Sequence, residues 1–316
     1  MWQLNLTILA IALMIFTHTT SACASEETEQ EQILRISHQA LSNEVSLTAP
    51  ELHAKISAND TSYYIISLQS SDEFAKGHIP GAHQFNLDYA NPEPALALLP
   101  RNKIIVVCDP NGQKSCQMTI FLRQLGYDAK TLLLGMEGWN KKFAGTGAYP
   151  AGRKQPLANA PTPLPLNAPE ASKPSALPDN DIILQKTRAY ASQRRPVNIS
   201  HKDLAAMKDS VLIISMQSPE DYAYAHIPGA ANLPAKAFIA GDHQLLQLPR
   251  NKKIVVTCYI GHYSNIGAMI LNQLGYEAYS LDWGLAGWNI SGFKTPSALL
   301  QADHRFPTEG TARNSN

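Results

Sequence analysis

The sequence repeats itself over most of its length, and this repeat restricts the fold more than any other feature. HIPGA begins at His78 and at His226, an offset of 148 residues. LPRNK, LGY and GWN also occur twice, and each of these three pairs is separated by 149 residues. A nearly constant offset indicates a tandem duplication of one folding unit. At 316 residues the chain is long enough for two such units, each with its own core.

Each repeat alternates short apolar runs with segments of helical periodicity, which predicts an α/β fold. Residues 254–256 form a β-branched run typical of a buried parallel strand. Beyond a short loop, apolar residues recur at helical spacing from Ile266 to Leu274, and Gly275 suits the end of that helix. The same pattern predicts strands at 45–47, 63–68, 197–199 and 211–216, and a helix at 181–195. Thr48 and Ser200 are expected to cap helices.

The loop between the strand and the helix of the second repeat, residues 258–264 (CYIGHYS), has the composition of a reactive site. Most free cysteines are inert core residues. Here, however, the thiol follows a buried strand and faces a helix N-terminus, where backbone N–H groups and the helix dipole favour a thiolate. Cys258 is therefore the candidate nucleophile. The candidate substrate-binding residues complete the loop: Tyr259, Ile260, Gly261, His262, Tyr263 and Ser264.

Three motifs in this order resemble the rhodanese sulfurtransferase family. They are C-x-x-G-x-x-S at 258–264, the segment 213–234 that contains HIPGA, and the closing turn LDWGLAGWN at 281–289. The resemblance implies two tandem rhodanese-like domains, each a five-stranded parallel sheet flanked by helices. It also implies that the loop cysteine accepts a sulfane sulfur as a persulfide and passes it to a thiophilic acceptor. The implied donor is thiosulfate, mercaptopyruvate or polysulfide, and the implied acceptor is cyanide or a thiol, including a protein thiol.

The repeat offset pairs Cys258 with Asp109, whereas Cys108 is paired with Thr257. A carboxylate cannot hold a transferable sulfur, so the first domain is expected to be non-catalytic. The expected degenerate site consists of Asp109, Gly112, Lys114 and Ser115. In an alternative register, Cys108 would begin a C-x5-K loop like that of rhodanese-like phosphatases and arsenate reductases. Lys114 does not replace the bidentate Arg that such a loop uses for a larger oxyanion.

Several positions depart from the family pattern and leave the sulfur donor open. The D-V-R triplet of the family is SLQ at 67–69 and SMQ at 215–217, so its ion pair is missing. Tyr263 stands where Arg often attracts an anionic donor. His262 is either a cation at low pH or a solvated side chain. His226 and the tryptophans of the GWN turns, Trp139 and Trp288, are expected to be structural.

Two other classes of function compete with sulfur transfer. A degenerate domain could act as a non-catalytic binding or sulfur-carrier module, which the missing charges favour and the intact loop around Cys258 opposes. A cysteine phosphatase would need an Arg six residues after the cysteine, where this chain has Ser264. No Cys/His set has metal-ligand spacing and no Gly-rich dinucleotide loop is present, so neither a metal nor an organic cofactor is expected. The 26 basic and 26 acidic residues balance, which does not favour a nucleic-acid partner.

The ends of the chain and the region between the repeats differ in composition from the repeats, which indicates a leader, a linker and a tail. Residues 1–24 read as a signal peptide, so we expect export, in a bacterium to the periplasm; a lipid anchor on Cys23 is the weaker alternative. Residues 25–144 and 180–296 are the expected domains, joined by a Pro/Ala-rich linker at 145–179 and followed by a flexible polar tail at 297–316. Residues 26–32 are also expected to be mobile. Removal of the leader leaves Cys108, Cys116 and Cys258, a set that does not suggest a disulfide framework.

Overall fold

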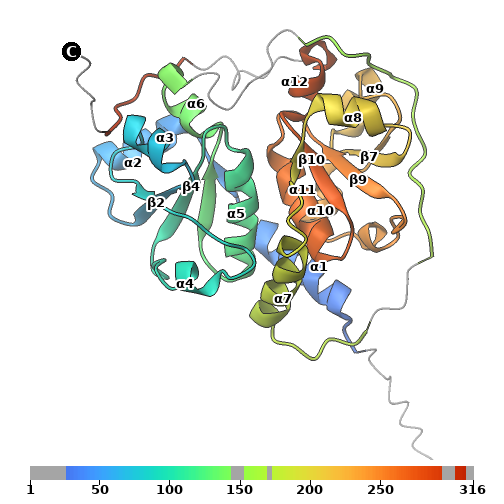
Figure 1. Cartoon of the computed structure of the whole chain (residues 1–316), viewed down its shortest axis with the longest axis horizontal. Coiled ribbons are helices and arrows are strands. Elements are labelled where there is room, and N and C mark those ends of the chain that lie inside the picture. The colour runs from blue at the N-terminus through green and yellow to red at the C-terminus, as the bar shows by residue number, and fades with distance from the viewer. Residues whose placement is uncertain (1–25, 144–152, 169–172, 294–302, 311–316) are drawn as a thin grey trace, which may run out of the picture.

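A computed structural model describes residues 26–143, 153–168, 173–293 and 303–310. They form two α/β domains that lie side by side (Figure 1). Each domain has a five-stranded sheet whose paired strands are all parallel, in the order β1-β5-β4-β2-β3 in the first and β6-β10-β9-β7-β8 in the second. The predicted fold class is confirmed. The expected signal peptide and its alternative lipid anchor lie outside the described residues.

The elements of the first domain follow the predicted alternation closely. Its strands are β1 (Ser46–Leu47), β2 (Tyr63–Ser67), β3 (His83–Gln84), β4 (Ile104–Cys108) and β5 (Ala129–Leu132). Its helices are α1 (Glu29–Leu41), α2 (Ala49–Ser57), α3 (Ser71–Lys76), α4 (Glu93–Leu96), α5 (Gln113–Gln124), α6 (Gly135–Trp139) and the 3-10 turn η1 (Lys141–Phe143). Thr48 caps α2 as predicted, with its side chain accepting from the Glu51 N–H.

The second domain repeats this order. Its strands are β6 (Asn198–Ile199), β7 (Val211–Ser215), β8 (Ala230–Asn232), β9 (Lys253–Thr257) and β10 (Ala278–Leu281). Its helices are α7 (Asp179–Ala191), α8 (His201–Met207), α9 (Pro219–Tyr224), α10 (Ala235–Ile239), α11 (His262–Gln273), α12 (Gly284–Trp288) and the 3-10 turns η2 (His243–Leu246) and η3 (Ile290–Gly292). Ser200 caps α8 as predicted.

The central strands β4 and β9 are covered on both faces, which explains their continuous β-branched runs. The pairing of the strands shows which residues of the two domains are equivalent. Ser67 of β2 lies opposite Cys108 of β4, and Ser215 of β7 lies opposite Thr257 of β9. Cys108 and Thr257 are therefore equivalent positions, as the sequence offset requires. The residue that follows each of them, Asp109 or Cys258, opens the loop that precedes α5 or α11.

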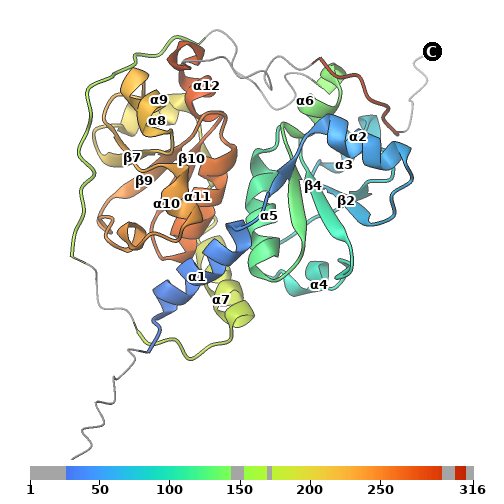
Figure 2. The same ribbon diagram turned by 180° about the vertical axis from the view of Figure 1, so that it is seen from behind.

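The two domains meet through α5 and α11, and α1 and α7 pack across this contact (Figure 2). Gln124 and Gln273 occupy equivalent positions on α5 and α11, and each donates its Nε2–H to the other's Oε1 at 2.8 Å. Such a mutual pair is what a two-fold axis between equivalent surfaces produces. The duplicated domains thus associate as a pseudo-dimer within one chain.

Residues 26–32 are not the mobile segment that their polar composition predicted. Thr28 and Glu31 form a capping box that starts α1 at Glu29, and Ile33 on its next turn is fully buried. The helix predicted at 181–195 begins earlier, at Asp179 after Pro178, and ends at Ala191. Both differences arise because α1 and α7 bury their apolar faces against the domain contact, which a single helical segment does not reveal.

Two extended arms are exchanged between the domains. The first arm, residues 153–168, follows the first domain but runs along the second, and the second arm, residues 303–310, follows the second domain but lies beside α6 of the first (Figure 1). Trp288 Nε1 donates to Pro156 O and Trp139 Nε1 donates to Pro307 O, both at 2.7 Å. The expectation of a flexible tail is thus wrong for residues 303–310, because their carbonyls satisfy buried donors of the opposite domain.

Candidate active site

Cys258 lies directly after β9, in a loop that is held rigidly. The loop ends at Gly261, whose φ of +87° belongs to the left-handed region that favours glycine. The loop carbonyls of Cys258 and Tyr259 accept hydrogen bonds from Leu285 N and Ala286 N, at 2.8 and 2.9 Å. Gly284 is required beside this loop, since a Cβ there would lie 2.3 Å from Cys258 O. Cys258 itself is only 5% exposed.

A chain of side-chain hydrogen bonds ends at the Cys258 thiol. Cys258 Sγ lies 3.5 Å from Ser264 Oγ, and Ser264 Oγ lies 2.8 Å from Ser280 Oγ of β10. Asn265 Nδ2 donates to Ser280 Oγ at 3.0 Å. With that donor fixed, the Ser280 hydroxyl can donate to Ser264, and the Ser264 hydroxyl can donate to sulfur once it is a thiolate. Asn265 and Ser280 are functional candidates that the loop motif did not include.

The equivalent loop of the first domain binds a negatively charged group, the carboxylate of Asp109. Asp109 is buried, and its Oδ1 accepts from Gly112 N at 2.6 Å and from Ser115 Oγ at 3.0 Å. Its Oδ2 accepts from Lys114 N at 3.0 Å. Burial raises the pKa of the Asp109 carboxyl, and these hydrogen bonds oppose the rise. The loop N–H groups and the serine hydroxyl thus form an anion cradle, here filled by the domain's own carboxylate.

The two cradles have the same construction. Gly112 and Gly261 have nearly identical backbone angles, with φ of +85° and +87°. In the first domain Thr131 Oγ1 donates to Ser115 Oγ at 2.7 Å, as Ser280 faces Ser264 in the second. The four predicted residues of the degenerate site therefore converge in space, and Cys258 lies where the first domain places a carboxylate.

Cys108 and Cys116 do not face a cradle. Cys108 is fully buried at the end of β4 in the core, and desolvation raises the pKa of its thiol well above the usual value. Cys116 lies in the first turn of α5, where burial likewise raises the pKa of its thiol. Neither environment favours a thiolate, so the alternative register with Cys108 as nucleophile gains no support from the structure. All three described cysteines are free.

Neutral pairs occupy the place of the missing D-V-R charges. Ser215 Oγ donates to Gln217 Oε1 at 2.8 Å, and Gln217 Nε2 donates to Ala225 O at 3.0 Å. Ser67 and Gln69 make the same arrangement in the first domain. The hydrogen-bonded bridge between the strand end and the HIPGA segment is therefore retained without buried charge. His226 packs locally as predicted, stacked on Tyr222 at a ring separation of 3.7 Å.

His262 is not the solvated side chain that was one of the two expectations, and its ring becomes a cation only at a pH well below neutral. It is 3% exposed, and burial lowers the pKa of its imidazole to about 4, so the ring is neutral near pH 7. Its Nε2–H donates to Asn111 O of the first domain at 3.1 Å. The sequence of the second repeat alone suggests a solvated position, but the first domain covers this residue and buries it. His262 therefore belongs to the contact between the loops and supplies no positive charge for a donor.

Tyr263 lies on the first turn of α11, because this helix begins earlier than the predicted loop 258–264 implies, and it is the exposed residue of that segment, at 36%. Burial of part of the ring raises the pKa of its hydroxyl, and the nearby Glu44 carboxylate raises it further. Tyr259 bonds to α9 and its cap: its hydroxyl donates to Asp221 and accepts from Ser218 N at 3.2 Å. Tyr259 also lines a groove of about 770 Å³ together with Lys236. Ile260 is half-buried and packs against the core of the second domain.

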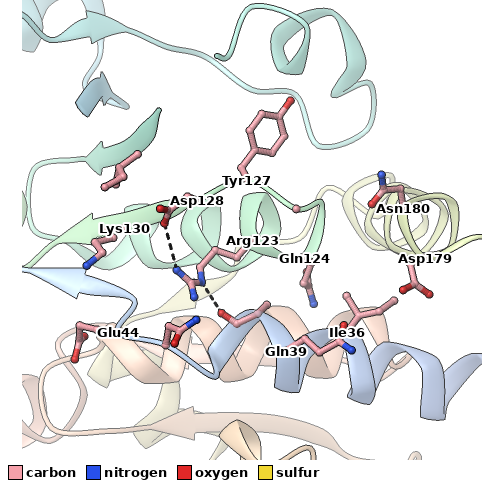
Figure 3. A pocket seen from close by; sticks show the side chains of 14 residues that line it. Ile36, Gln39, Glu44, Arg123, Gln124, Tyr127, Asp128, Lys130, Asp179 and Asn180 are labelled. Atoms are coloured by element: carbon pink, nitrogen blue, oxygen red, sulfur yellow. Dashed lines mark hydrogen bonds and ion pairs between the residues drawn. The ribbon is translucent and has the colours of Figure 1, made fainter. Parts of the chain in front are cut away.

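Another cavity is separate from this loop. It measures about 830 Å³ and lies between α1 and the C-terminal half of α5, with Glu44, Lys130 and Asp179 on its walls (Figure 3). Arg123 spans it, donating to Ala40 O and approaching Asp128 at 4.0 Å. Cys258 is not among its lining residues. Within the described ranges, no cluster of three His, Cys, Asp or Glu side chains could hold a metal ion, and no helix is long and apolar enough to cross a membrane.

Comparison with known proteins assigns the family. The model of the rhodanese-like domain matches residues 48–142 and again residues 200–291, more than half of the chain. The chain belongs to the rhodanese family. One match falls within each of the two domains described above, so this is a tandem-domain rhodanese.

The chain is also similar to individual proteins that are named as sulfurtransferases. Thiosulfate sulfurtransferase GlpE of Pseudoalteromonas translucida is 34% identical over 85 residues, which cover 27% of this chain and 78% of that protein. GlpE of Tolumonas auensis is 29% identical over 98 residues, covering 31% and 90% respectively. The crystal structure of a thiosulfate sulfurtransferase from Pseudomonas aeruginosa is 21% identical, with a TM-score of 0.30, and covers 85% of this chain and 49% of its own. The tandem rhodanese is accordingly a rhodanese-type sulfurtransferase.

Proposed function

We propose that this tandem rhodanese moves a sulfane sulfur from a small donor to a thiophilic acceptor through a persulfide on Cys258. The observation that carries the proposal is the carboxylate of Asp109 in the equivalent cradle, held by two backbone N–H groups and one hydroxyl. The matching donors in the second domain are Gly261 N–H, Tyr263 N–H and the Ser264 hydroxyl. They would stabilise a negatively charged sulfur in the same place.

The chemistry proceeds in two displacement steps. With a sulfane donor, the Cys258 thiolate attacks the outer sulfur, a sulfur–sulfur bond forms on the cysteine, and the donor's own sulfur–sulfur bond breaks; with mercaptopyruvate the carbon–sulfur bond breaks instead, and the pyruvate enolate leaves with the electron pair. With thiosulfate, sulfite leaves with the electron pair and Cys258 becomes a persulfide anion. An acceptor thiolate or cyanide then attacks the terminal sulfur, forms a persulfide or thiocyanate, and returns the Cys258 thiolate. Charge and electrons balance without an external oxidant or reductant.

The charges near the loop favour donors with little negative charge. Tyr263 brings a hydroxyl where the family often has Arg, and Glu44 lies close enough to raise the pKa of that hydroxyl. His262 is neutral, so it does not attract an anion. The curated relatives are thiosulfate sulfurtransferases, which makes thiosulfate a donor to test. We propose a donor with one negative charge, a singly protonated polysulfide or an organic persulfide, as the better donor, and a thiol, including a protein thiol, as the acceptor.

We further propose that the sulfur transfer takes place after export, in the periplasm. The support is the apolar N-terminal stretch with its Ala22-Cys23-Ala24 cleavage pattern. Fractionation of cells that express the full chain, with mass measurement of the mature N-terminus, tests this proposal. An intact N-terminus in the cytoplasmic fraction would contradict it.

Intact-mass measurement tests the sulfur-transfer proposal directly. The protein is exposed in turn to thiosulfate, mercaptopyruvate and polysulfide, and the expected product gains the mass of one sulfur atom, which cyanide or a thiol removes. Cys258→Ser should abolish the gain, whereas the matched Cys108→Ser variant should retain it. Loading of the Cys258→Ser variant, or failure of the folded wild-type protein to load from every donor, would refute the proposal and favour a non-catalytic binding module.

A further inference from the structure

The side chain of Gln113 reaches from the non-catalytic domain into the Cys258 loop. It is 2% exposed, and its Oε1 accepts the backbone N–H of Trp283 at 3.2 Å. The same oxygen accepts Asn198 Nδ2 at 3.1 Å. Because a backbone N–H can only donate, this contact fixes which terminal atom of Gln113 is the oxygen. Gln113 thus supplies an acceptor to a buried donor of the other domain.

Gln113 also occupies the space beside the loop glycine. A Cβ at Gly261 would lie 2.7 Å from Gln113 Oε1, so the amide packs against the backbone of the residue that ends the loop. Trp283 has a φ of +60°, a left-handed conformation that costs a non-glycine residue free energy and requires support. Gly284 follows it and packs on Cys258 O. One side chain of the first domain therefore contacts both segments that enclose Cys258.

The contact is reciprocal between equivalent positions. His262 and Gln113 are both the first residue of the helix that follows the loop, α11 or α5. His262 Nε2 donates to Asn111 O of the first loop at 3.1 Å, while Gln113 Oε1 accepts from Trp283 beside the second. The first loop has no nucleophile to position, but the second has one. The Gln113 contact can therefore affect the position of a nucleophile, whereas the His262 contact cannot.

We infer that Gln113 is a positioning residue for Cys258, through which the non-catalytic domain holds the catalytic loop in its working shape. The inference rests on the function proposed above. Gln113 acts through Trp283 and Gly261, which keep the loop N–H groups aimed at the sulfur. Electrostatic stabilisation by such donors depends on their being fixed before the reaction begins. The first domain is thereby required for full activity although it carries no sulfur.

Three variants of the full chain separate positioning from general loosening of the domain contact. Gln113→Met keeps the length of the side chain but removes the acceptor, and Gln113→Glu restores an acceptor oxygen. Gln124→Met is the matched control, because it removes a buried glutamine from the same contact, where Gln124 pairs with Gln273 instead of the loop. All three are compared for thermal stability, kcat and KM of sulfur transfer, and rate of alkylation of Cys258 at one fixed pH.

Gln113→Met should lower kcat and the alkylation rate about tenfold or more, because the Trp283 N–H loses the acceptor oxygen of Gln113, with KM changed less than about twofold. Gln113→Glu should recover most of both rates. Gln124→Met should lower the melting temperature while changing kcat by less than about twofold. Equal losses of kcat in Gln113→Met and Gln124→Met, or no loss in Gln113→Met, would overturn the inference.

Hydrogen exchange provides a second test that does not require activity. The Trp283 amide should exchange faster in Gln113→Met than in Gln124→Met, and equal protection in the two variants would overturn the inference. Alkylation and exchange report on the loop even if no sulfur donor is found. A failed inference is thus distinguishable from a failed function, which appears instead as absence of sulfur loading in the wild-type protein.

Discussion

Replacement of Asp109 by Asn should destabilise the first domain although the side chain keeps its size. The carboxylate accepts three hydrogen bonds: from Gly112 N and Ser115 Oγ on Oδ1, and from Lys114 N on Oδ2. An amide has only one oxygen, so its NH₂ group must face at least one of these donors. The least costly orientation keeps the oxygen toward Gly112 and Ser115 and leaves the Lys114 N–H unsatisfied.

The expected loss in free energy of unfolding is about 1–3 kcal/mol. An unsatisfied buried donor costs about 1–3 kcal/mol, and the remaining hydrogen bonds lose their charge assistance. Relief from burying a charge offsets part of this loss, since burial raises the pKa of Asp109. The predicted sign is destabilising because three donors converge on one carboxylate.

Urea denaturation of wild type and variant measures this change, and hydrogen exchange of the α5 amides assigns it to the first domain. Asp128→Asn is the control, because Asp128 is exposed and approaches Arg123 only at 4.0 Å. Its expected effect is below about 0.5 kcal/mol. A change for Asp109→Asn no larger than the control, or one confined to the second domain, would refute the description of the cradle.

Three further predictions follow from the two loops. In a Cys258→Ser background, Asp109→Cys should restore sulfur loading, seen as the mass of one sulfur atom on the first domain; a folded variant that never loads would show that the cradles are not equivalent. Tyr263→Arg should lower the KM for thiosulfate about ten- to hundredfold, more at low ionic strength, because it adds a charge-assisted hydrogen bond; unchanged kinetics would place residue 263 outside the donor site. The pKa of His262, lowered by burial to about 4 from 6.5, lies below its unfolded value, so the unfolded chain binds more protons between these limits. The contribution of His262 to the free energy of unfolding should therefore be fully present above pH 6.5 and fall by about 3 kcal/mol as the pH drops to 4. A pH series of denaturation curves should show this slope, and the slope should disappear in His262→Gln.

Much of the candidate site could be predicted from local sequence. A β-branched run, a glycine loop and a helical period placed Cys258 between β9 and α11, and the offset of 149 residues placed Asp109 in the equivalent position. These signals are local because a strand end and a helix N-terminus are specified by neighbouring residues. Asn265 and Ser280 were missed for the same reason, since Ser280 of β10 meets Ser264 and Asn265 only when α11 packs on β10.

The sequence alone determined the duplication, the α/β class, the register that separates Cys108 from Asp109, and the identity of the candidate nucleophile. Only the tertiary structure decided which contacts the two repeats make with each other. The arms at 153–168 and 303–310 crossed to the opposite domains, His262 became buried and neutral, and Gln113 came to support the Cys258 loop. The physical reason is that each of these residues forms hydrogen bonds with the opposite domain, whose residues are distant in the sequence. Periodicity and loop motifs carry no information about such partners until the two cores pack together.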